Sequence, residues 1–508
     1  MNIWLNLIWK EWHEQKWKLL ALTVIALSVC VAMLSQDVHS AEFALVSTMW
    51  AFVMFAPTFV AMGVSAGEHA SGVIRFVRAQ PVPAWKVATA RCLAGVCLLI
   101  IPILCSSLLC WLAAFAWPQS GPYSVRTASL SGLPDEWTFS LKLVVLTGIG
   151  LAASVNLYAW IVAITVNQRT EFRAGLIGLL VTVVLFVLGS VGLDGQESSG
   201  FRLPSLHAGP MVWVSVIDFI RNSRDGLVAL AVAWQWVLTL GLMAIMVRQY
   251  GREERWLQGE LHKKVRPACA EYACLRPPMS SRWRALLWLQ LSRSIPVCIA
   301  GLAIVFVIIF VAPSSARLAY DSLHPLVGCV LALLIGVGSY VPELDPKLHT
   351  FWRSRPISPA SWFWFKYVGG LVALIGLFDL PYALLVWMRM VPSSSPGIAA
   401  CFPMVLHLLC YSLAVLAACS VRHSSYSTVL AVCALVAILL PSLADFRIPQ
   451  YLSFFELWEK ASRFERAYRY NWGAMSFLWT ACALVGTIAL PVTATAAYLI
   501  KRDISVAP

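Results

Sequence analysis

Residues 94–117 read AGVCLLIIPILCSSLLCWLAAFAW, a run without one charged side chain. An α-helix of about 20 apolar residues is long enough to cross the roughly 30 Å hydrocarbon core of a bilayer. A soluble protein rarely contains such a run, because it has no lipid to cover it. This stretch therefore predicts a transmembrane helix.

Similar runs recur along the whole chain of 508 residues, which is 59% hydrophobic and only 12% charged, with a mean hydropathy of +0.75. This composition excludes a soluble globular protein. The first run, 19–34, has no clear cleavage site after it, so we interpret it as a retained helix and not a signal peptide. We expect an all-α polytopic membrane protein of about 12 transmembrane helices, near 17–35, 44–66, 86–117, 139–166, 174–193, 225–247, 294–312, 324–342, 367–390, 398–420, 428–444 and 473–499.

The distribution of basic residues predicts the orientation of these helices. With the N-terminus in the cytoplasm, most of the 38 Lys and Arg residues fall on cytoplasmic segments, as expected for a membrane protein. Both termini are then cytoplasmic. The net charge of +13 is thus a topology signal that favours contact with membrane lipids, and it does not indicate a nucleic-acid partner.

An internal repeat divides the chain. Segment 61–100 aligns without a gap with 336–375, which lies 275 positions further on. The matches fall on charged, glycine, proline and aromatic positions, where chance matching among aliphatic residues does not explain them. We therefore expect two parallel six-helix units, 1–250 and 286–508, joined by a basic cytoplasmic linker, 251–285. The matched pairs are Gly63 and Gly338, Glu68 and Glu343, Phe76 and Phe351, Arg78 and Arg353, Pro81 and Pro356, Arg91 and Lys366, and Gly95 and Gly370.

Two segments carry a resemblance to a known family. Leu7-Ile8-Trp9-Lys10-Glu11-Trp12, ahead of the first span, and Glu68-His69-Ala70-Ser71-Gly72-Val73-Ile74-Arg75-Phe76, followed by Gln80-Pro81-Val82-Pro83, resemble ABC type-2 transporter permeases. The second copy, Glu343-Leu344-Asp345-Pro346-Lys347, lacks the Ser-Gly step of that pattern.

The resemblance implies that each six-helix unit is a transmembrane domain of an exporter in a bacterial inner membrane. It also implies that the loop after each second helix couples to an ATPase. The sequence contains no Gly-x-x-x-x-Gly-Lys-Ser/Thr phosphate loop, so ATP and Mg would bind to separate nucleotide-binding subunits, two per chain, and this chain would hold no cofactor and would not itself be an enzyme. Ordinary positive-inside charge is the alternative reading of the loops. The expected coupling residues are Glu68, Arg75, Phe76, Arg78, Pro81, Glu343, Phe351, Arg353, Arg355 and Pro356.

Two predicted external segments are amphipathic. Segment 453–468 places aromatic and aliphatic side chains on one helical face, and a weaker version precedes the sixth span. The family resemblance implies external helices that close the outer end of the pathway, and plain interfacial helices are the alternative. The expected gate residues are Trp213, Ile217, Phe454, Leu457, Trp458 and Phe464.

Polar side chains inside the spans are costly in hydrocarbon and so mark structural or functional positions. We expect Asn156, Asp379 and His407 to form hydrogen bonds between helices, with a proton relay as the alternative for the last two. His207, His324 and His349 are scattered and predict no metal site. Most of the 14 cysteines lie inside spans as small packing residues.

The sequence is compatible with three classes of function. The leading one is the permease of an ATP-driven exporter that works by alternating access. The alternative is an ion-coupled secondary transporter, which calls for membrane carboxylates in both halves, whereas this chain offers little beyond Asp379. A polytopic membrane enzyme acting on lipids comes third, since no cluster of His, Asp or Glu at catalytic spacing is evident.

Overall fold

A computed structural model of the chain describes residues 3–34, 41–70, 82–116, 138–168, 171, 173–182, 184–185, 220, 225–250, 282–311, 317–344, 358–388, 396–443, 486 and 488–502. Within these ranges every regular element is a helix. The first half contains α1 (Ile3–Leu34), α2 (Ala41–Ala70), α4 (Ala84–Ala116), α5 (Phe139–Thr165) and α8 (Asp225–Gln249). The second half contains α10 (Arg282–Val311), α11 (Arg317–Tyr340), η3 (Val341–Glu343), α13 (Pro359–Leu374), η4 (Ile375–Asp379), α14 (Leu380–Trp387), α15 (Pro396–Val421) and α16 (Ser424–Leu443).

Six of the described helices are long and apolar enough to cross a membrane. Their outer surfaces carry large apolar side chains; Val144, Leu240 and Trp387 are 68%, 62% and 71% exposed. Exposed apolar side chains at this density suit lipid as the surrounding medium. The chain is therefore a membrane protein. The described helices overlap all the expected spans, and the count of 12 stays a prediction. The six helices are Trp4–Leu34, Ala84–Ala114, Ser140–Thr165, Ala229–Gln249, Pro359–Trp387 and Ala400–Val421.

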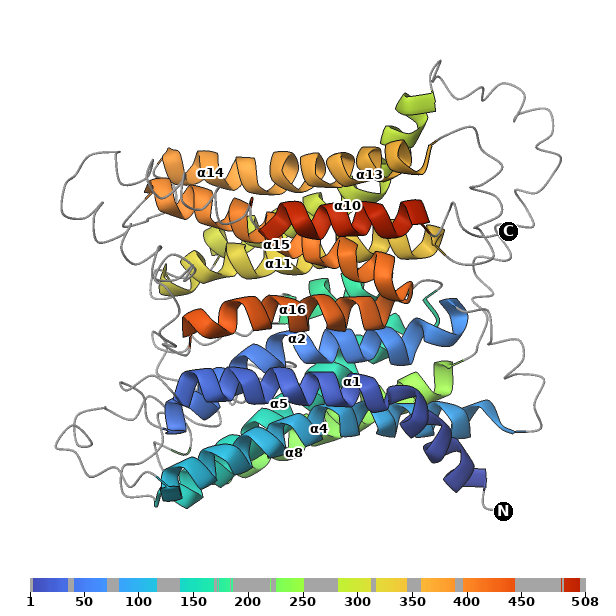
Figure 1. Ribbon diagram of the computed structural model, residues 1–508. Coiled ribbons are helices and arrows are strands. Elements are labelled where there is room, and N and C mark those ends of the chain that lie inside the picture. Colours follow the sequence, from blue (N-terminus) through green and yellow to red (C-terminus); the bar gives the residue numbers. More distant parts are fainter. Residues whose placement is uncertain are drawn as a thin grey trace.

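The helices form one bundle in which they run roughly side by side (Figure 1). The first-half helices lie together, and α10, α11, α13, α14 and α15 lie together beyond them. Between the two groups is α16, which contacts α1 and α2 as well as α11 and α15. The start of α1 and the end of the last described segment, 488–502, lie at the same end of the bundle. This placement fits an even number of crossings.

Local signals fix where several helices begin. The hydroxyl of Ser358 accepts the backbone N–H of Ser361, and Pro359 occupies the first position of α13, where a missing N–H costs nothing. Thr138 caps α5 in the same way by accepting from the N–H of Leu141. Helix starts of this kind are encoded by three or four neighbouring residues.

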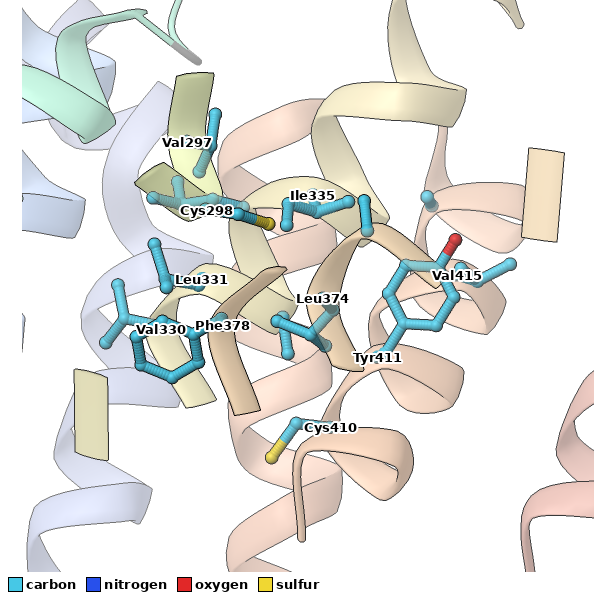
Figure 2. Packing of buried hydrophobic residues seen from close by; sticks show 14 of the residues in the cluster. Val297, Cys298, Val330, Leu331, Ile335, Leu374, Phe378, Cys410, Tyr411 and Val415 are labelled. Carbon is cyan, nitrogen blue, oxygen red and sulfur yellow. The ribbon is translucent and has the colours of Figure 1, made fainter. Parts of the chain in front are cut away.

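Tight packing holds each half together, since the hydrophobic effect supplies little attraction between helices in lipid. In the second half, Leu331, Leu374 and Phe378 interdigitate from α11, α13 and η4 (Figure 2). Small residues let the helix axes approach, and an added Cβ at Gly336 of α11 would lie 2.6 Å from the Cβ of Ala414 in α15. The first half has a separate core built from its own helices.

Candidate functional site

The same tyrosine contact occurs in both halves. The Tyr158 hydroxyl of α5 donates to the backbone oxygen of Cys92 in α4 at 3.4 Å, and the Tyr411 hydroxyl of α15 donates to that of Tyr367 in α13 at 3.2 Å. Cys92 and Tyr367 are 275 positions apart, the offset of the repeat. In each half a glycine makes room for the ring, because a Cβ at Gly95 or Gly370 would overlap the tyrosine hydroxyl. These matching contacts relate the two halves in three dimensions.

Both halves also place a left-handed residue just after the helix that carries this tyrosine. Asn167 follows α5 with a φ of 70°, and Arg422 follows α15 with a φ of 55°. Non-glycine residues rarely adopt this conformation. The side chain of Asn167 donates to the backbone oxygen of Gln249 at 2.7 Å, which ties this turn to the end of α8. Each of the two helices is thus followed by a residue with positive φ.

A buried cation stands one turn before each of the two glycines. Arg91 is 4% exposed, and its Nε lies 3.3 Å from a carboxylate oxygen of Glu11 in α1. At the matching position Lys366 is 2% exposed, and its Nζ lies 2.7 Å from a carboxylate oxygen of Glu343. Arg91 also donates to the hydroxyl of Tyr250, just past the end of α8, at 3.3 Å. Each half therefore buries an ion pair near one end of the bundle. The acid comes from α1 in the first half and from η3 in the second half.

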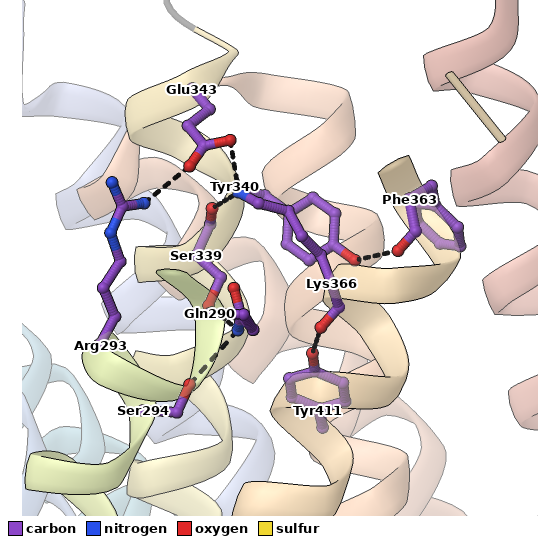
Figure 3. A network of polar contacts seen from close by, with 9 residues as sticks. All are labelled: Gln290, Arg293, Ser294, Ser339, Tyr340, Glu343, Phe363, Lys366 and Tyr411. Atoms are coloured by element: carbon purple, nitrogen blue, oxygen red, sulfur yellow. Dashed lines mark hydrogen bonds and ion pairs between the residues drawn. The ribbon is translucent and has the colours of Figure 1, made fainter. Parts of the chain in front are cut away.

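The ion pair of the second half belongs to a larger network, shown in Figure 3. Arg293 of α10 donates to the other oxygen of Glu343 at 2.8 Å. Lys366 also donates to the backbone oxygen of Ser339 at 2.6 Å, while Gln290 donates to the Ser339 hydroxyl at 2.7 Å. Glu343 thus has a cation on each oxygen, which offsets the cost of removing its charge from water.

This network joins the two sides of the predicted second coupling loop. Glu343 ends η3, directly after α11, and Lys366 lies two turns into α13, on the other side of the loop. The buried charges hold α10, α11 and α13 together at the end of the bundle where α1 also begins (Figure 1). The network therefore ties three helices together beside this predicted loop.

A second polar cluster lies deeper in the second half. Asp379 and His407 are almost completely buried, and an oxygen of Asp379 lies 2.7 Å from Nδ1 of His407. His407 Nε2 lies 3.0 Å from the backbone oxygen of Pro325. His324, also buried, places its Nε2 3.5 Å from the same Asp379 oxygen. Three helical segments, α11, η4 and α15, thus contribute one side chain each.

The helix that carries Asp379 is irregular at this point. Residues 375–379 form one π-helical turn, and Pro381 follows in α14. Proline has no N–H to donate, so it leaves a backbone oxygen of the preceding turn without its helical partner. A π turn inserts an extra residue, which rotates the side chains after it, and such turns are frequent at functional sites. At the same offset of 275, α4 remains α-helical although Pro102 lies within it, and it has the apolar Ile103 and Leu104. The cluster therefore has no counterpart there.

Asn156 lies in the first half, away from both clusters. Its side chain donates to Gln235 at 3.1 Å and to Thr239 at 2.9 Å, both in α8. These hydrogen bonds link α5 to α8 through buried side chains. Of the three intramembrane polar residues predicted, the structure joins Asp379 to His407 and leaves Asn156 in a separate contact.

Most of the other predicted site residues lie outside the residues that the structure describes. Glu343 is the described member of the coupling set, and Glu68 lies in α2 with its side chain outside the described part. The rest of the coupling set is Arg75, Phe76, Arg78, Pro81, Phe351, Arg353, Arg355 and Pro356, and the gate set is Trp213, Ile217, Phe454, Leu457, Trp458 and Phe464.

Sequence reasoning misses several members of these clusters. It groups His324 with the scattered histidines, but the structure places this residue against Asp379. It predicts no partner for Glu11 or Arg293, whereas Glu11 binds the buried Arg91 and Arg293 binds the buried Glu343. A usable signal is present for Arg91 and Lys366, since a charge one turn before a glycine in an apolar helix is unusual.

Comparison with known proteins adds no assignment, because no protein-family model and no curated protein matches the chain. Among the described residues, no group of three or more His, Cys, Asp or Glu side chains is arranged to hold a metal ion. Any functional assignment therefore depends on the buried polar clusters and on the repeat.

Proposed function

We propose that this chain is the transmembrane permease of an ATP-driven exporter. ATP would be hydrolysed on two separate nucleotide-binding subunits that dock at the end of the bundle where both termini lie, which would be the cytoplasmic face of a bacterial inner membrane. The two halves, 1–250 and 286–508, would each act as one transmembrane domain of a duplicated permease. This proposal rests on the family resemblance together with the repeated geometry of the halves.

One observation carries the proposal. The buried cations Arg91 and Lys366 hold equivalent positions near the same end of both halves. In the second half the ion pair directly flanks the loop that the resemblance makes a coupling element. A buried ion pair on the helix that follows each of the two loops would let a permease receive force from two ATPase subunits at once.

These connections suggest a mechanism. Closure of two ATPase subunits would move the loops 71–81 and 345–357, and the helix after each loop, α4 or α13, is tied by a buried ion pair to another element. Breaking such a pair costs several kcal/mol, so the tied helices would move as one body. The two bundles would then rock about the interface formed by α16 with α1 and α2, opening the pathway to alternate sides.

Affinity purification tests the proposal. The tagged full-length chain is purified from its native membrane in mild detergent, the bound proteins are identified, and ATPase activity is measured. We expect a soluble ATP-binding-cassette protein at about two copies per chain. A chain that is recovered alone and without ATPase activity would contradict the proposal.

Charge reversal in the loops tests the docking surface. Arg78→Glu with Arg353→Glu should abolish recovery of the ATPase while the chain still reaches the membrane. Arg447→Glu, in a predicted external loop, is the matched control and should leave recovery unchanged. Reversal at Glu343 would instead perturb folding, because its charge is buried between two cations. Equal recovery with both variants would show that the loops do not dock the ATPase.

A second candidate function has one observation in its favour. Asp379, with two histidines beside it, is the kind of buried titratable cluster that ion-coupled transporters use. At the position that matches Asp379 the first half has the apolar Leu104, which favours the ATP-driven permease. Transport that continues without ATP but stops when the proton gradient is dissipated would favour the ion-coupled transporter.

A further inference from the structure

The contacts of His407 fix how many protons it shares. Its Nε2 lies 3.0 Å from the backbone oxygen of Pro325, which can only accept, so Nε2 carries a hydrogen. Its Nδ1 lies 2.7 Å from an oxygen of Asp379. Without a proton between them, two lone pairs would face each other at this distance. The contact therefore contains one proton, whether it is written on the imidazole or on the carboxyl group.

We propose that Asp379 and His407 form a proton-binding site inside the membrane domain, and that the structure shows the site with its proton bound. The pair is neutral in this state, since a neutral imidazole with a carboxylic acid and an imidazolium with a carboxylate carry the same total charge. Loss of the proton leaves one negative charge in a buried place. The ligand of this site is H⁺ itself.

His324 provides the partner for the proton-free state. Its ring stacks on Tyr382 and Phe378, with centroids 3.7 Å and 4.6 Å away. Apart from a contact with the backbone of Phe378, its ring nitrogens have no hydrogen-bond partner among the described residues, and Oδ2 of Asp379 has none there either. When the proton leaves the pair for water, the Asp379 carboxylate can turn to accept an N–H from neutral His324. The proton is the only atom that leaves, and the carboxylate exchanges one histidine for the other.

The other titratable groups that face the pair are thiols and a phenol. They are Cys298 of α10, Cys329 of α11, Cys410 of α15 and Tyr382 of α14. These groups are ordinarily neutral near pH 7. Histidine is the side chain that ordinarily exchanges a proton between about pH 5 and pH 8. Of the two histidines here, His407 has the shorter contact with Asp379, 2.7 Å against 3.5 Å for His324, so proton exchange is assigned to the Asp379–His407 pair.

The backbone around Asp379 can convert this exchange into movement. The π turn 375–379 and Pro381 interrupt the regular hydrogen bonding of the helix beside the carboxylate. A shift of Asp379 from α15 toward α11 would bend the helix at this point, so α13 and α14 would change their relative angle. This inference goes beyond the proposed function and holds whether transport is driven by ATP hydrolysis or by an ion gradient.

Infrared difference spectroscopy tests the proposal. Spectra of the full-length chain in lipid nanodiscs are compared between about pH 5 and about pH 9, the range in which a histidine-linked site titrates. We expect a coupled carboxyl and imidazole signal that Asp379→Asn and His407→Gln each remove completely. Ser154→Ala, a buried change on α5 in the first half, should retain it. Absence of the signal in the unmodified chain, or its persistence in either variant, would overturn the proposal.

A further variant tests the proposal even if Asp379→Asn and His407→Gln fail to fold. A Cβ at Gly328 of α11 would overlap the His407 ring, so Gly328→Ala displaces His407 without removing a titratable group. We expect the midpoint pH of the signal to shift by about one unit or more, because the shared hydrogen bond is lengthened. Gly241→Ala, where the added methyl group meets open space, should leave the midpoint unchanged. An unshifted midpoint in Gly328→Ala would overturn the proposal.

Discussion

Replacing Lys366 by Met should destabilise the second half, because it leaves the Glu343 carboxylate buried with one cation fewer. At an effective dielectric constant of about 20, opposite unit charges 2.7 Å apart attract by about 6 kcal/mol. Desolvation cancels much of this, and removing one partner of a buried pair costs about 3–5 kcal/mol. Since Arg293 still binds Glu343 at 2.8 Å, we expect a loss near the lower value, about 3 kcal/mol in the free energy of unfolding.

Reversible unfolding in mixed micelles, followed by far-ultraviolet circular dichroism, measures this change. Lys10→Met is the matched control, because Lys10 is 43% exposed and its ion pairs should contribute about 0–1 kcal/mol. The double variant Lys366→Met with Glu343→Met removes both buried charges and should recover most of the lost stability. The reasoning is refuted if Lys366→Met unfolds like the control, or if the double variant is no more stable than the single one.

Two further predictions concern packing and hydrogen bonding. Gly370→Ala should cost about 1–3 kcal/mol of unfolding free energy, because the new methyl group overlaps the buried Tyr411 hydroxyl. Gly241→Ala is the control and should cost nothing. Equal stabilities of the two variants in the same unfolding assay would contradict this prediction. Asn156→Leu should lower the free energy of unfolding by about 1 kcal/mol, because it breaks the hydrogen bonds of Asn156 to Gln235 and Thr239 in α8. An unchanged free energy of unfolding would show that these hydrogen bonds contribute nothing to stability.

Much of the helical architecture could be predicted from the sequence, because apolarity over about 20 residues is a local property. Residues 94–117 predict a span, and the structure has α4 over Ala84–Ala116. The repeat offset of 275 pairs Gly95 with Gly370, and the structure gives each of them the same tyrosine contact. The external and loop residues of the predicted sites stay predictions, since they lie outside the described residues.

The sequence by itself determined that the chain is a helical membrane protein, which positions repeat, and that Asp379 lies inside an apolar helix. The tertiary structure alone decided which charges meet. Glu11 and Arg91, like His324 and Asp379, come from different helices, and their contact depends on the rotation and depth of each helix in the bundle. The π turn 375–379 shows why the sequence could not predict these contacts. One extra residue in a turn rotates the side chains beyond it, and that rotation cannot be predicted from hydropathy.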